Sequence, residues 1–371
     1  MVQQTFLLCA GGTGGHLFPA EALAHELIAR GHIVHLATDD RAERFAASFP
    51  AEAIHVIPSA TIGSKNPVAL LRTARQLLAG YRAARKLIGQ LKPAAAIGFG
   101  GYPTLPPMIA ARHMGVATLI HDANAVMGRA NRLLAKRANL VAMGFAGVAA
   151  DERVIVTGNP VRPAVLDAAA VAYPQRGVDE VFNLLVFGGS QGAHFFSEIL
   201  PQAMALMTPP EKALLQVTCQ ARQEDIARLS GLLSTYGIKA ETAPFFADMP
   251  ERIARSHLVV SRGGASTVSE LSVIGRPAVL IPFPHALDHD QALNGWAMVE
   301  AGGARIIVQS DLSAGKLAGI VKSAMKDPQG LALQAENAKK TGIPDAAGRL
   351  ADCVEQIASG RTAAQLKELH S

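Results

Sequence analysis

The chain has 371 residues, which is more than one typical hydrophobic core needs and suits two domains of ordinary size. With 49% apolar residues, 18% charged residues and a formal net charge of +5, its composition is that of a globular protein. Three well-separated cysteines without a CxxC spacing argue against a zinc site and are typical of a reduced, cytosolic protein. We expect no signal peptide, because the N-terminus MVQQTFLLCAGG lacks a basic segment and its apolar run is too short. We also expect no membrane span, because no window of ~18 uninterrupted apolar residues exists.

Short apolar or β-branched runs alternate with longer amphipathic stretches along the whole chain. This alternation predicts an α/β fold with parallel sheets covered by helices. In the first half, strands are expected near TFLLCA, HIVHLAT, AIHVI, AAIGF, ATLI, NLVAM and RVIVT. In the second half, they are expected near FNLLVF, LLQVT, KAETA, HLVVS, PAVLI and ARIIV. We therefore predict two Rossmann-like domains whose parallel sheets face each other across a cleft.

The first expected strand ends in a glycine-rich loop, LLCAGGTGGH, at residues 7–16. Free N–H groups beside the positive end of a helix form a cradle for an anion such as phosphate. The spacing is not a dinucleotide fingerprint, because Leu17 stands where the third glycine would be, and no Walker A motif is present. A tight turn that binds no ligand is the alternative interpretation.

His16 follows these glycines at the expected N-terminus of a helix. A neutral imidazole has a suitable pKa to act as a general base, and the helix dipole disfavours its protonated form. We therefore expect an acidic limb near pH ~6–7 in the rate profile if His16 is the base. The alternative is that His16 only caps the helix or hydrogen-bonds substrate.

A long segment of the first half carries basic residues but no acidic ones. Residues 53–121 contain eight lysines and arginines, five of them in the amphipathic stretch 66–91, NPVALLRTARQLLAGYRAARKLIGQL. A helix with apolar and basic faces suits an anionic membrane surface, and a solvated core helix is the alternative. We predict no nucleic-acid partner, because Tyr81 is the only aromatic residue of this helix and no nucleic-acid-binding motif is present.

Other histidines lie in repeating helix or strand patterns, which favours surface or packing roles for His25, His32, His35, His55 and His113. The stretch LIHDAN is different, because His121 and Asp122 stand at the end of a strand, where loops line the predicted cleft. Asp122 is the second candidate for the base.

A stretch rich in proline and glycine, GNPVRPAVLDAAAVAYPQRG, is expected to link the two halves of the chain.

Two more helix starts follow glycines in the second half. LLVFGGSQGAH repeats the run, the paired glycines and the small hydroxyl residue of the first loop. In VVSRGGASTVSEL, a strand is expected to end at Ser261 and a helix to open at Ala265. N–H groups and hydroxyls at this helix start can hold a diphosphate without a metal, and Glu270 can accept hydrogen bonds from ribose hydroxyls. A simple capped helix is the alternative.

The stretch HALDHDQ offers a competing interpretation as a metal site. Its candidate ligands are His285, Asp288, His289 and Asp290, and three of these residues match a DxD pattern. Short matches of this kind arise by chance, and helix N-termini already supply positive charge for a leaving diphosphate. We predict neither a catalytic metal nor another cofactor.

The motifs GGTGGHLFPA, GFGGYPT, HDANAVMGRAN, GNPVR, FGGSQGA and RGGASTVSEL, in this order and spacing, resemble those of the MurG family of bacterial glycosyltransferases over nearly the whole chain. The resemblance implies the GT-B fold. It implies an N-terminal domain at 1–162 for acceptor and membrane, a donor domain at 163–345, and a last helix at 346–371 that returns to the N-terminal domain. It also makes His121 and Asp122 acceptor-side or structural residues.

The activity that the resemblance implies is an inverting transfer in peptidoglycan synthesis, and thus in cell division and cell shape. N-acetylglucosamine would move from UDP-N-acetylglucosamine to the 4-hydroxyl of the N-acetylmuramyl-pentapeptide of lipid I, giving lipid II. The enzyme would lie on the cytoplasmic face of the bacterial inner membrane as a peripheral protein. The alternatives are a UDP-N-acetylglucosamine 2-epimerase, another lipid glycosyltransferase of this fold, or a non-catalytic subunit that binds nucleotide sugar at the membrane.

The resemblance also implies site residues. His16 is the proposed catalytic base. The implied donor-binding residues are Thr13, Gly14, Gly15, Asn124, Arg162, Ser190, Gln191, Phe246, Ala265, Ser266, Thr267, Val268, Ser269, Glu270 and Gln291. Phe246 would lie over the uracil, where the family uses backbone contacts, and Gln291 with Asn124 would reach the sugar. One departure makes the sugar contacts less secure: Asp290 stands where the family often has another glutamine.

Overall fold

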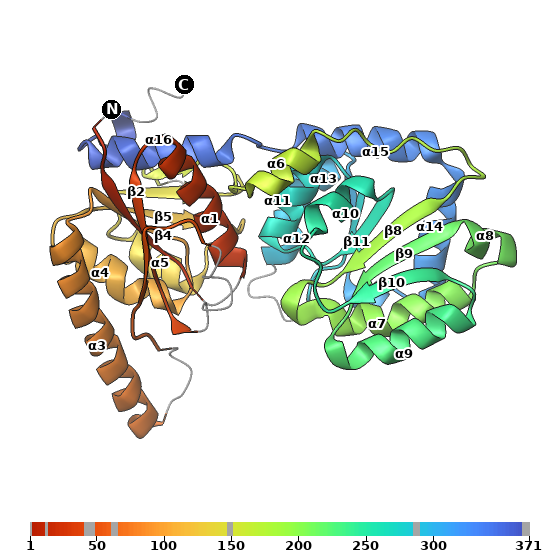
Figure 1. Ribbon diagram of the computed structural model, residues 1–371, viewed down its shortest axis with the longest axis horizontal. Coiled ribbons are helices and arrows are strands. Elements are labelled where there is room, and N and C mark those ends of the chain that lie inside the picture. The colour runs from red at the N-terminus through yellow and green to blue at the C-terminus, as the bar shows by residue number, and fades with distance from the viewer. Residues whose placement is uncertain are drawn as a thin grey trace. The chain divides into compact units, whose positions relative to one another are not determined.

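The computed structural model describes residues 2–11, 14–40, 49–60, 66–146, 151–284 and 290–365. The chain divides into two compact units (Figure 1). Unit 1 combines Met1–Arg162 with Pro344–Ser371, and unit 2 is Pro163–Ile343. Every strand that the sequence predicts is present, and both sheets are parallel, so the predicted α/β fold is confirmed. The three cysteines are buried and free.

Unit 1 is built on a seven-stranded sheet with the order β3-β2-β1-β4-β5-β6-β7. Its strands are β1 (Thr5–Cys9), β2 (Ile33–Thr38), β3 (Ala53–Val56), β4 (Ala95–Gly98), β5 (Ala117–Asp122), β6 (Leu140–Met143) and β7 (Val154–Val156). Its helices are α1 (Gly14–Ala29), α3 (Pro67–Leu91), the 3₁₀ turn η2 (Tyr102–Thr104), α4 (Leu105–His113), α5 (Arg129–Ala135) and α16 (Ala346–Ala358).

Alternation along β1 directs side chains to two separate cores. Phe6 and Leu8 pack with α1 and with α16. Leu7 and Cys9, which point to the opposite face, pack with α3 and α4. Both faces of this strand are therefore covered by helices, as expected for a central parallel strand that is apolar throughout.

Unit 2 contains a six-stranded sheet with the order β10-β9-β8-β11-β12-β13. Its strands are β8 (Phe182–Phe187), β9 (Leu215–Gln220), β10 (Lys239–Ala243), β11 (Leu258–Ser261), β12 (Ala278–Leu280) and β13 (Ala304–Ile306). Its helices are α6 (Pro163–Ala169), α7 (Gly189–Ala205), α8 (Pro209–Leu214), α9 (Gln223–Thr235), α10 (Met249–Arg255), α11 (Ala265–Ile274), α12 (Asp290–Asn294), α13 (Trp296–Glu300), the 3₁₀ turn η4 (Gln309–Asp311), α14 (Ala314–Lys326) and α15 (Pro328–Lys340).

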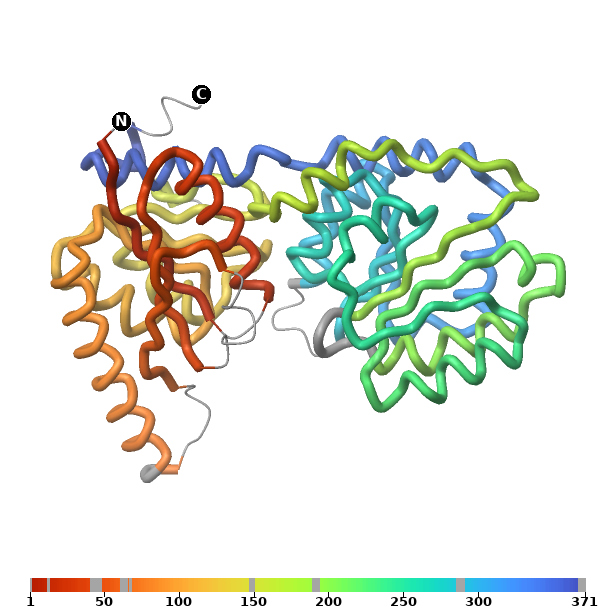
Figure 2. The backbone as a smooth tube through the Cα atoms, viewed as in Figure 1, coloured from red at the N-terminus to blue at the C-terminus, as the bar shows by residue number. Residues whose placement is uncertain are grey.

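The core of unit 2 lies between its sheet and the helices α7, α9 and α14. Phe196 and Leu200 of α7 pack there with Leu229 of α9, Leu317 of α14 and alternate side chains of the strands. The helices α6, α10 and α11 form a second group that packs together, which the tube in Figure 2 lets the reader follow along the chain.

The stretch expected to be a linker is partly helical. Residues 163–169 form α6, which packs against α10 and α11. Its Val165 is fully buried. Proline at the first helical position suits a helix start, because its missing N–H would have no partner there. The prediction of a linker over 158–177 was therefore too broad, since α6 belongs to the packed body of unit 2.

Helix α3, orange in Figure 1, extends beyond the sheet of unit 1 at one end. Its C-terminal half is packed, with Ala84, Leu87 and Ile88 in the core. In its first half, Leu70, Leu71 and Leu78 are 44–54% exposed, beside exposed arginines. No helix in the described ranges is long and apolar enough to cross a membrane.

Candidate functional site

Each sheet has one point where the strand order reverses, and the glycine loops lie there. In unit 1, β1 pairs with both β2 and β4, and in unit 2, β8 pairs with both β9 and β11. Open parallel sheets bind ligands beyond the carboxyl ends of the strands at such reversals. Helices α1, α7 and α11 each begin a few residues after one of these strands. The topology therefore gives each unit one candidate site.

His16 lies at the candidate site of unit 1. It is the third residue of α1, as the sequence predicts, and its Nδ1 lies 3.1 Å from the carbonyl oxygen of Gly11. Since a carbonyl can only accept, Nδ1 carries the proton and donates it in this bond. The lone pair of the neutral ring then belongs to Nε2. The ring is therefore held in the tautomer that a general base requires.

Two glycines after β4 make room for this imidazole. Gly100 and Gly101 have φ angles of 99° and 82°, which side chains other than glycine rarely adopt. A Cβ atom on Gly100 would also stand 3.0 Å from Cδ2 of His16 and 3.2 Å from its Nε2. The motif GFGGYPT thus forms the wall against which His16 packs. Because His16 follows β1 and the two glycines follow β4, the sequence alone does not show this contact.

Burial is the largest influence on the protonation of His16. It lowers the pKa below the ordinary 6.5, while the charge of Asp122 and the bond to Gly11 partly oppose that shift. A base with a lowered pKa stays neutral to a lower pH than an ordinary imidazole does. The expected acidic limb near pH 6–7 therefore moves to below pH 6.5, because desolvation outweighs the nearby carboxylate.

Asp122, the second candidate for the base, is buried and bonded. Its Oδ1 accepts from the backbone N–H of Asn124 at 3.0 Å. Its Oδ2 accepts from the N–H of Gly128 at 2.8 Å and from Nδ2 of Asn131 at 3.0 Å. A carboxylate fixed by these donors organises the loop after β5. Asn131, which sequence analysis did not single out, also donates to the carbonyl of His121 and so ties α5 to this strand end.

His121 is completely buried, and burial lowers its pKa to about 4. Its Nε2 lies 3.3 Å from the carbonyl of Gly158. The ring is therefore a neutral donor within the body of unit 1.

Arg162, the last residue of the motif GNPVR, contacts helix α1. Its guanidinium stacks over the ring of Phe18, 4.0 Å from the ring centroid. The GNPVR motif is thereby fixed to helix α1.

The start of α11 forms the site of unit 2. Its N-cap is Gly264, which provides no side-chain cap, and the first intrahelical bond runs from the N–H of Val268 to the carbonyl of Gly264. The three preceding N–H groups thus lie outside the helical pattern, at the positive end of the helix. The Oγ atom of Ser266 is buried and has no hydrogen-bond partner among the described residues. This group of donors suits a diphosphate.

The two glycines before α11 serve different purposes. A Cβ atom on Gly263 would collide with the backbone carbonyl of Gln291, so this glycine permits α12 to approach. Gly264 has an ordinary φ of −64°, and only Oγ1 of Thr267, at 3.9 Å, lies within 4 Å of a Cβ atom built on it. Neither strain nor packing within the described residues explains this second glycine, whereas close approach of a ligand would.

The other predicted residues of α11 lie in different surroundings. Val268 is in the core, and the hydroxyl of Ser269 donates to the carbonyl of Ala265 at 2.9 Å. Glu270, only 8% exposed, lies in the second turn of the helix, as predicted. A carboxylate this close to the N-terminus is favoured by the helix dipole.

Gln291 is oriented by a backbone contact. Its Oε1 accepts from the N–H of Phe283 at 2.9 Å. Because Oε1 is the acceptor, Nε2 is the end of the amide that can donate to a sugar hydroxyl. Asn294, one turn further along α12, donates from Nδ2 to the carbonyl of Gly263 at 3.1 Å and joins the two helix starts.

Arg262 is a buried cation that sequence analysis did not single out. Its guanidinium donates to the carbonyls of Ile281 and Pro282 at 3.1 and 3.3 Å, and to Oε1 of Gln309 at 2.7 Å. Burial lowers its pKa to about 10, so the group stays charged at neutral pH. It places a positive charge directly before the glycine pair. The only feature of the sequence that could have pointed to Arg262 is its place at the start of the motif RGGASTVSEL.

The remaining predicted residues differ in what the structure describes. The backbone of Ser190 and Gln191 lies in the first turn of α7, not in a loop. Phe246 is 6% exposed and lies under the guanidinium of Arg252, so little of its ring is open to a nucleotide base. Gly14 and Gly15 open α1. Thr13 and the metal candidates His285, Asp288 and His289 lie outside the described residues, as does the side chain of Asp290.

Comparison with known families decides the classification. The N-terminal domain model of glycosyltransferase family 28 matches residues 6–143, and its C-terminal domain model matches residues 183–350. The chain belongs to glycosyltransferase family 28. The first match runs from β1 to β6 and the second from β8 into α16, and together they confirm the predicted family of enzymes.

Full-length relatives are similar to this chain at more than half of their positions. Proteins named UDP-N-acetylglucosamine--N-acetylmuramyl-(pentapeptide) pyrophosphoryl-undecaprenol N-acetylglucosamine transferase are 57% identical in Rhizobium leguminosarum bv. trifolii and in Allorhizobium ampelinum. The first match covers 97% of both chains, and the second covers both completely. The relative from Sinorhizobium fredii is 58% identical over 98% of both chains.

Solved structures confirm the GT-B fold. The structure of Acinetobacter baumannii MurG has a TM-score of 0.76 and 28% identity, and the match covers 96% of this chain and all of that one. A putative UDP-N-acetylglucosamine 2-epimerase from Listeria monocytogenes has a TM-score of 0.68 but 11% identity, with 98% of this chain and 99% of that one covered. The second likeness concerns the fold alone.

Proposed function

We propose that this chain transfers N-acetylglucosamine from UDP-N-acetylglucosamine to the 4-hydroxyl of the N-acetylmuramyl-pentapeptide of lipid I, forming lipid II in peptidoglycan synthesis. The observation that carries this proposal is the 57% identity, over the full length, with transferases whose names specify both substrates. The site geometry supplies the chemistry. It supports an acid–base role in unit 1 and diphosphate binding in unit 2.

In the proposed mechanism, Nε2 of His16 takes the proton from the acceptor hydroxyl. The hydroxyl oxygen attacks the anomeric carbon of the donor sugar from the face opposite to UDP, the bond to the diphosphate oxygen breaks, and the configuration inverts. His16 suits this role because its bond to Gly11 places the lone pair on Nε2 and burial keeps the ring neutral. Asp122 suits it less well, because three N–H donors already hold its carboxylate.

The donor binds at the start of α11 in this proposal. The N–H groups of Ala265, Ser266 and Thr267 and the hydroxyl of Ser266 stabilise the diphosphate as its negative charge grows. Glu270 accepts hydrogen bonds from the ribose hydroxyls, and Nε2 of Gln291 donates to the sugar. The other predicted donor residues stay predictions: Thr13, Gly14, Gly15, Asn124, Arg162, Ser190, Gln191 and Phe246.

We further propose that α3 docks on anionic lipid at the cytoplasmic face of the inner membrane, as a peripheral attachment. The exposed leucines of its first half supply apolar area, and the neighbouring arginines supply charge. The acceptor carries a polyprenyl anchor, so attachment to the membrane would bring the enzyme to its substrate.

Product analysis tests the proposed reaction. The purified chain, given UDP-N-acetylglucosamine and a lipid I analogue, should release UDP in equal amount to the disaccharide product. UDP-glucose and UDP-N-acetylgalactosamine should be poor donors. Formation of N-acetylmannosamine without the lipid acceptor would instead support the 2-epimerase, whose fold is similar. Nucleotide binding without any turnover would support a non-catalytic subunit.

A further inference from the structure

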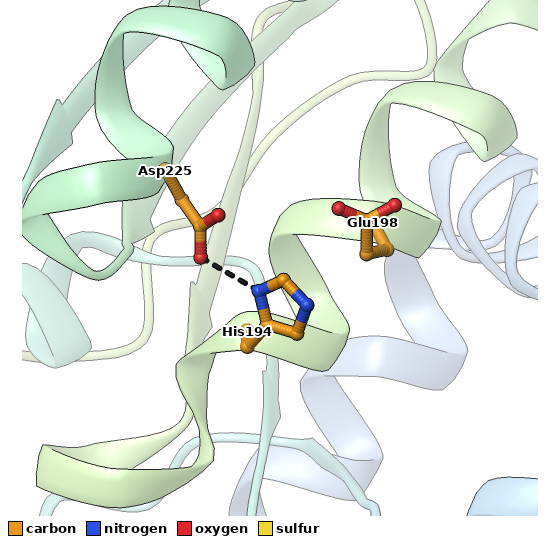
Figure 3. Close-up of side chains that lie close together, drawn as sticks. All are labelled: His194, Glu198 and Asp225. Atoms are coloured by element: carbon orange, nitrogen blue, oxygen red, sulfur yellow. Dashed lines mark hydrogen bonds and ion pairs between the residues drawn. The ribbon is translucent and has the colours of Figure 1, made fainter.

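A cluster of possible metal ligands lies in unit 2, outside the residues discussed so far. His194 and Glu198 are one turn apart on α7, and Asp225 belongs to the first turn of α9. Figure 3 shows the imidazole of His194 between the two carboxylates, with its Nδ1 directed at Asp225. One nitrogen or oxygen atom from each residue lies within 4.8 Å of those of the other two.

The three side chains are close enough to bind one ion after small rotations. Nδ1 of His194 is already 2.9 Å from Oδ2 of Asp225. The side chain of His194 is 56% exposed, so an ion can reach the ring from solvent, whereas that of Asp225 is nearly buried and fixed. Residues i and i+4 on a helix present their side chains on one face, as a chelating pair requires. Two helices therefore contribute ligands to one point.

Both carboxylates of the cluster already pair with one cationic side chain, that of Arg228. The hydrogen bond from His194 is the main reason that the pKa of Asp225 lies below its ordinary value, and Arg228 contributes in the same direction. The guanidinium of Arg228 pairs with Glu198, and it also lies 3.5 Å from Oδ1 of Asp225. A cationic side chain now occupies the position beside both carboxylates.

We propose that His194, Glu198 and Asp225 bind a zinc ion that cross-links α7 and α9. One imidazole nitrogen and two carboxylate oxygens are ligands that Zn²⁺ accepts in a four-coordinate site, with water in the last position. Mg²⁺ and Ca²⁺ prefer all-oxygen sites, so the imidazole makes them poorer candidates. Arg228 competes with the ion, because both neutralise the same carboxylates. The site uses no residue of the proposed catalytic machinery.

A zinc titration of the full-length protein tests this site. Zn²⁺ is added in competition with a chromophoric chelator, and the absorption spectrum of added Co²⁺ reports the ligand geometry. We expect one Zn²⁺ per chain and a higher melting temperature with zinc. His194→Gln and Glu198→Gln should each weaken binding by more than about tenfold, since even the loss of a residue that only orients a ligand costs about that much. Arg228→Gln should strengthen binding, because the competing cation is gone.

Matched variants keep the outcome clear. His113→Gln removes another exposed histidine, on α4 of unit 1, and should leave zinc affinity unchanged. The melting temperature without zinc shows whether each variant is folded. Zinc binding that persists in folded His194→Gln and Glu198→Gln proteins, or the absence of binding to the unaltered chain, would overturn the assignment.

Discussion

At the scale of single residues, His16 shows how one hydrogen bond can decide a chemical role. The bond to Gly11 assigns the tautomer, and the walls formed by Gly100 and Gly101 hold the ring in place. We expect His16→Ala to lower kcat about 10²–10⁴-fold, the usual contribution of a general base. UDP affinity should change little, because the proposed diphosphate site belongs to unit 2. Steady-state kinetics and calorimetry with UDP measure the two quantities.

The pH profile of the unaltered enzyme extends this test. The base must be neutral, so the rate falls as pH falls through the pKa of His16, which burial places below 6.5. The variant should lack this limb. A His16→Ala enzyme that keeps both the limb and most of its turnover would transfer the role to Asp122 or to water. His25→Ala, at an exposed position of the same helix, is the control.

Glu270 carries the second prediction at this scale. If its carboxylate accepts from ribose hydroxyls, Glu270→Ala should weaken the binding of UDP and of UDP-N-acetylglucosamine alike, by about 1.5–3 kcal/mol for a charged hydrogen-bond partner. Calorimetry with UDP alone is the decisive measurement. Unchanged UDP affinity would remove Glu270 from the site.

Gln291→Glu is the matched variant for Glu270. The new carboxylate can still accept from the N–H of Phe283, but the donor that Gln291 offers to the sugar is lost. Affinity for the sugar nucleotide should fall, whereas affinity for UDP should not. The pair of variants thus separates contacts to the nucleoside from contacts to the sugar.

The positions of candidate site residues were predictable where the sequence signal is local. Glycines, a hydroxyl and an acid predicted the helix start at α11, and the histidine after LLCAGGTGG lies in the first turn of α1 as predicted, whereas the roles of these residues stay predictions. The packing of Gly100 against His16 was not predictable, because it depends on β4 lying beside β1. The burial of Arg262 was equally hidden, since composition does not tell which arginines a fold encloses.

At the scale of elements, the strands were predictable because nearly all are short apolar runs with clear ends; the exposed β10, KAETA, is the exception. Helix α6 was not, because its proline and alanines also suit a linker. Its packing depends on distant residues: Arg276 follows α11 and donates to the carbonyls of Val171 and Ala172, just beyond α6, and to that of Ala254 in α10. The buried guanidinium of Arg276 thus joins α10 to the residues after α6, which are distant in the sequence.

Helix α3 gives the prediction that belongs to this scale. Near an anionic surface each cation contributes about 1 kcal/mol, so replacing four arginines by glutamine should greatly weaken vesicle binding. The replaced residues are Arg72, Arg75, Arg82 and Arg85. Turnover of a soluble acceptor analogue should stay the same, because α3 contributes no site residue. Sedimentation with anionic and neutral vesicles measures the binding.

The control for α3 changes the same number of charges in unit 2. Four of the lysines exposed there are Lys239, Lys316, Lys326 and Lys340, and their replacement by glutamine should leave most of the binding intact. Equal binding of the unaltered protein to neutral and anionic vesicles would contradict the electrostatic part of the proposal. Loss of binding in both sets of variants would show that net charge, rather than α3, is responsible.

At the scale of the whole molecule, the last helix completes the first unit. Leu350, Val354 and Ile357 of α16 are buried in the core that α1 and β1 share. Arg30, directly after α1, donates to Asp352 at 2.6 Å and to Glu355 at 3.0 Å, which fixes α1 and α16 side by side (Figure 1). The folding of unit 1 therefore depends on residues that are synthesised after all of unit 2.

This dependence gives the last prediction. Leu350→Ala should lower the free energy of unfolding of unit 1 by about 2–5 kcal/mol, because it leaves a cavity in a fully packed core. Leu333→Ala, at an exposed position of α15, should change stability by no more than about 0.5 kcal/mol. Hydrogen exchange resolved by peptide measures each unit separately. Protection should fall in β1, β4 and α1 while β8 and β11 keep theirs, because α16 packs in the core of unit 1. Equal loss in both units would mean that the two unfold as one cooperative body, and no loss in β1 would mean that α16 is dispensable for that core.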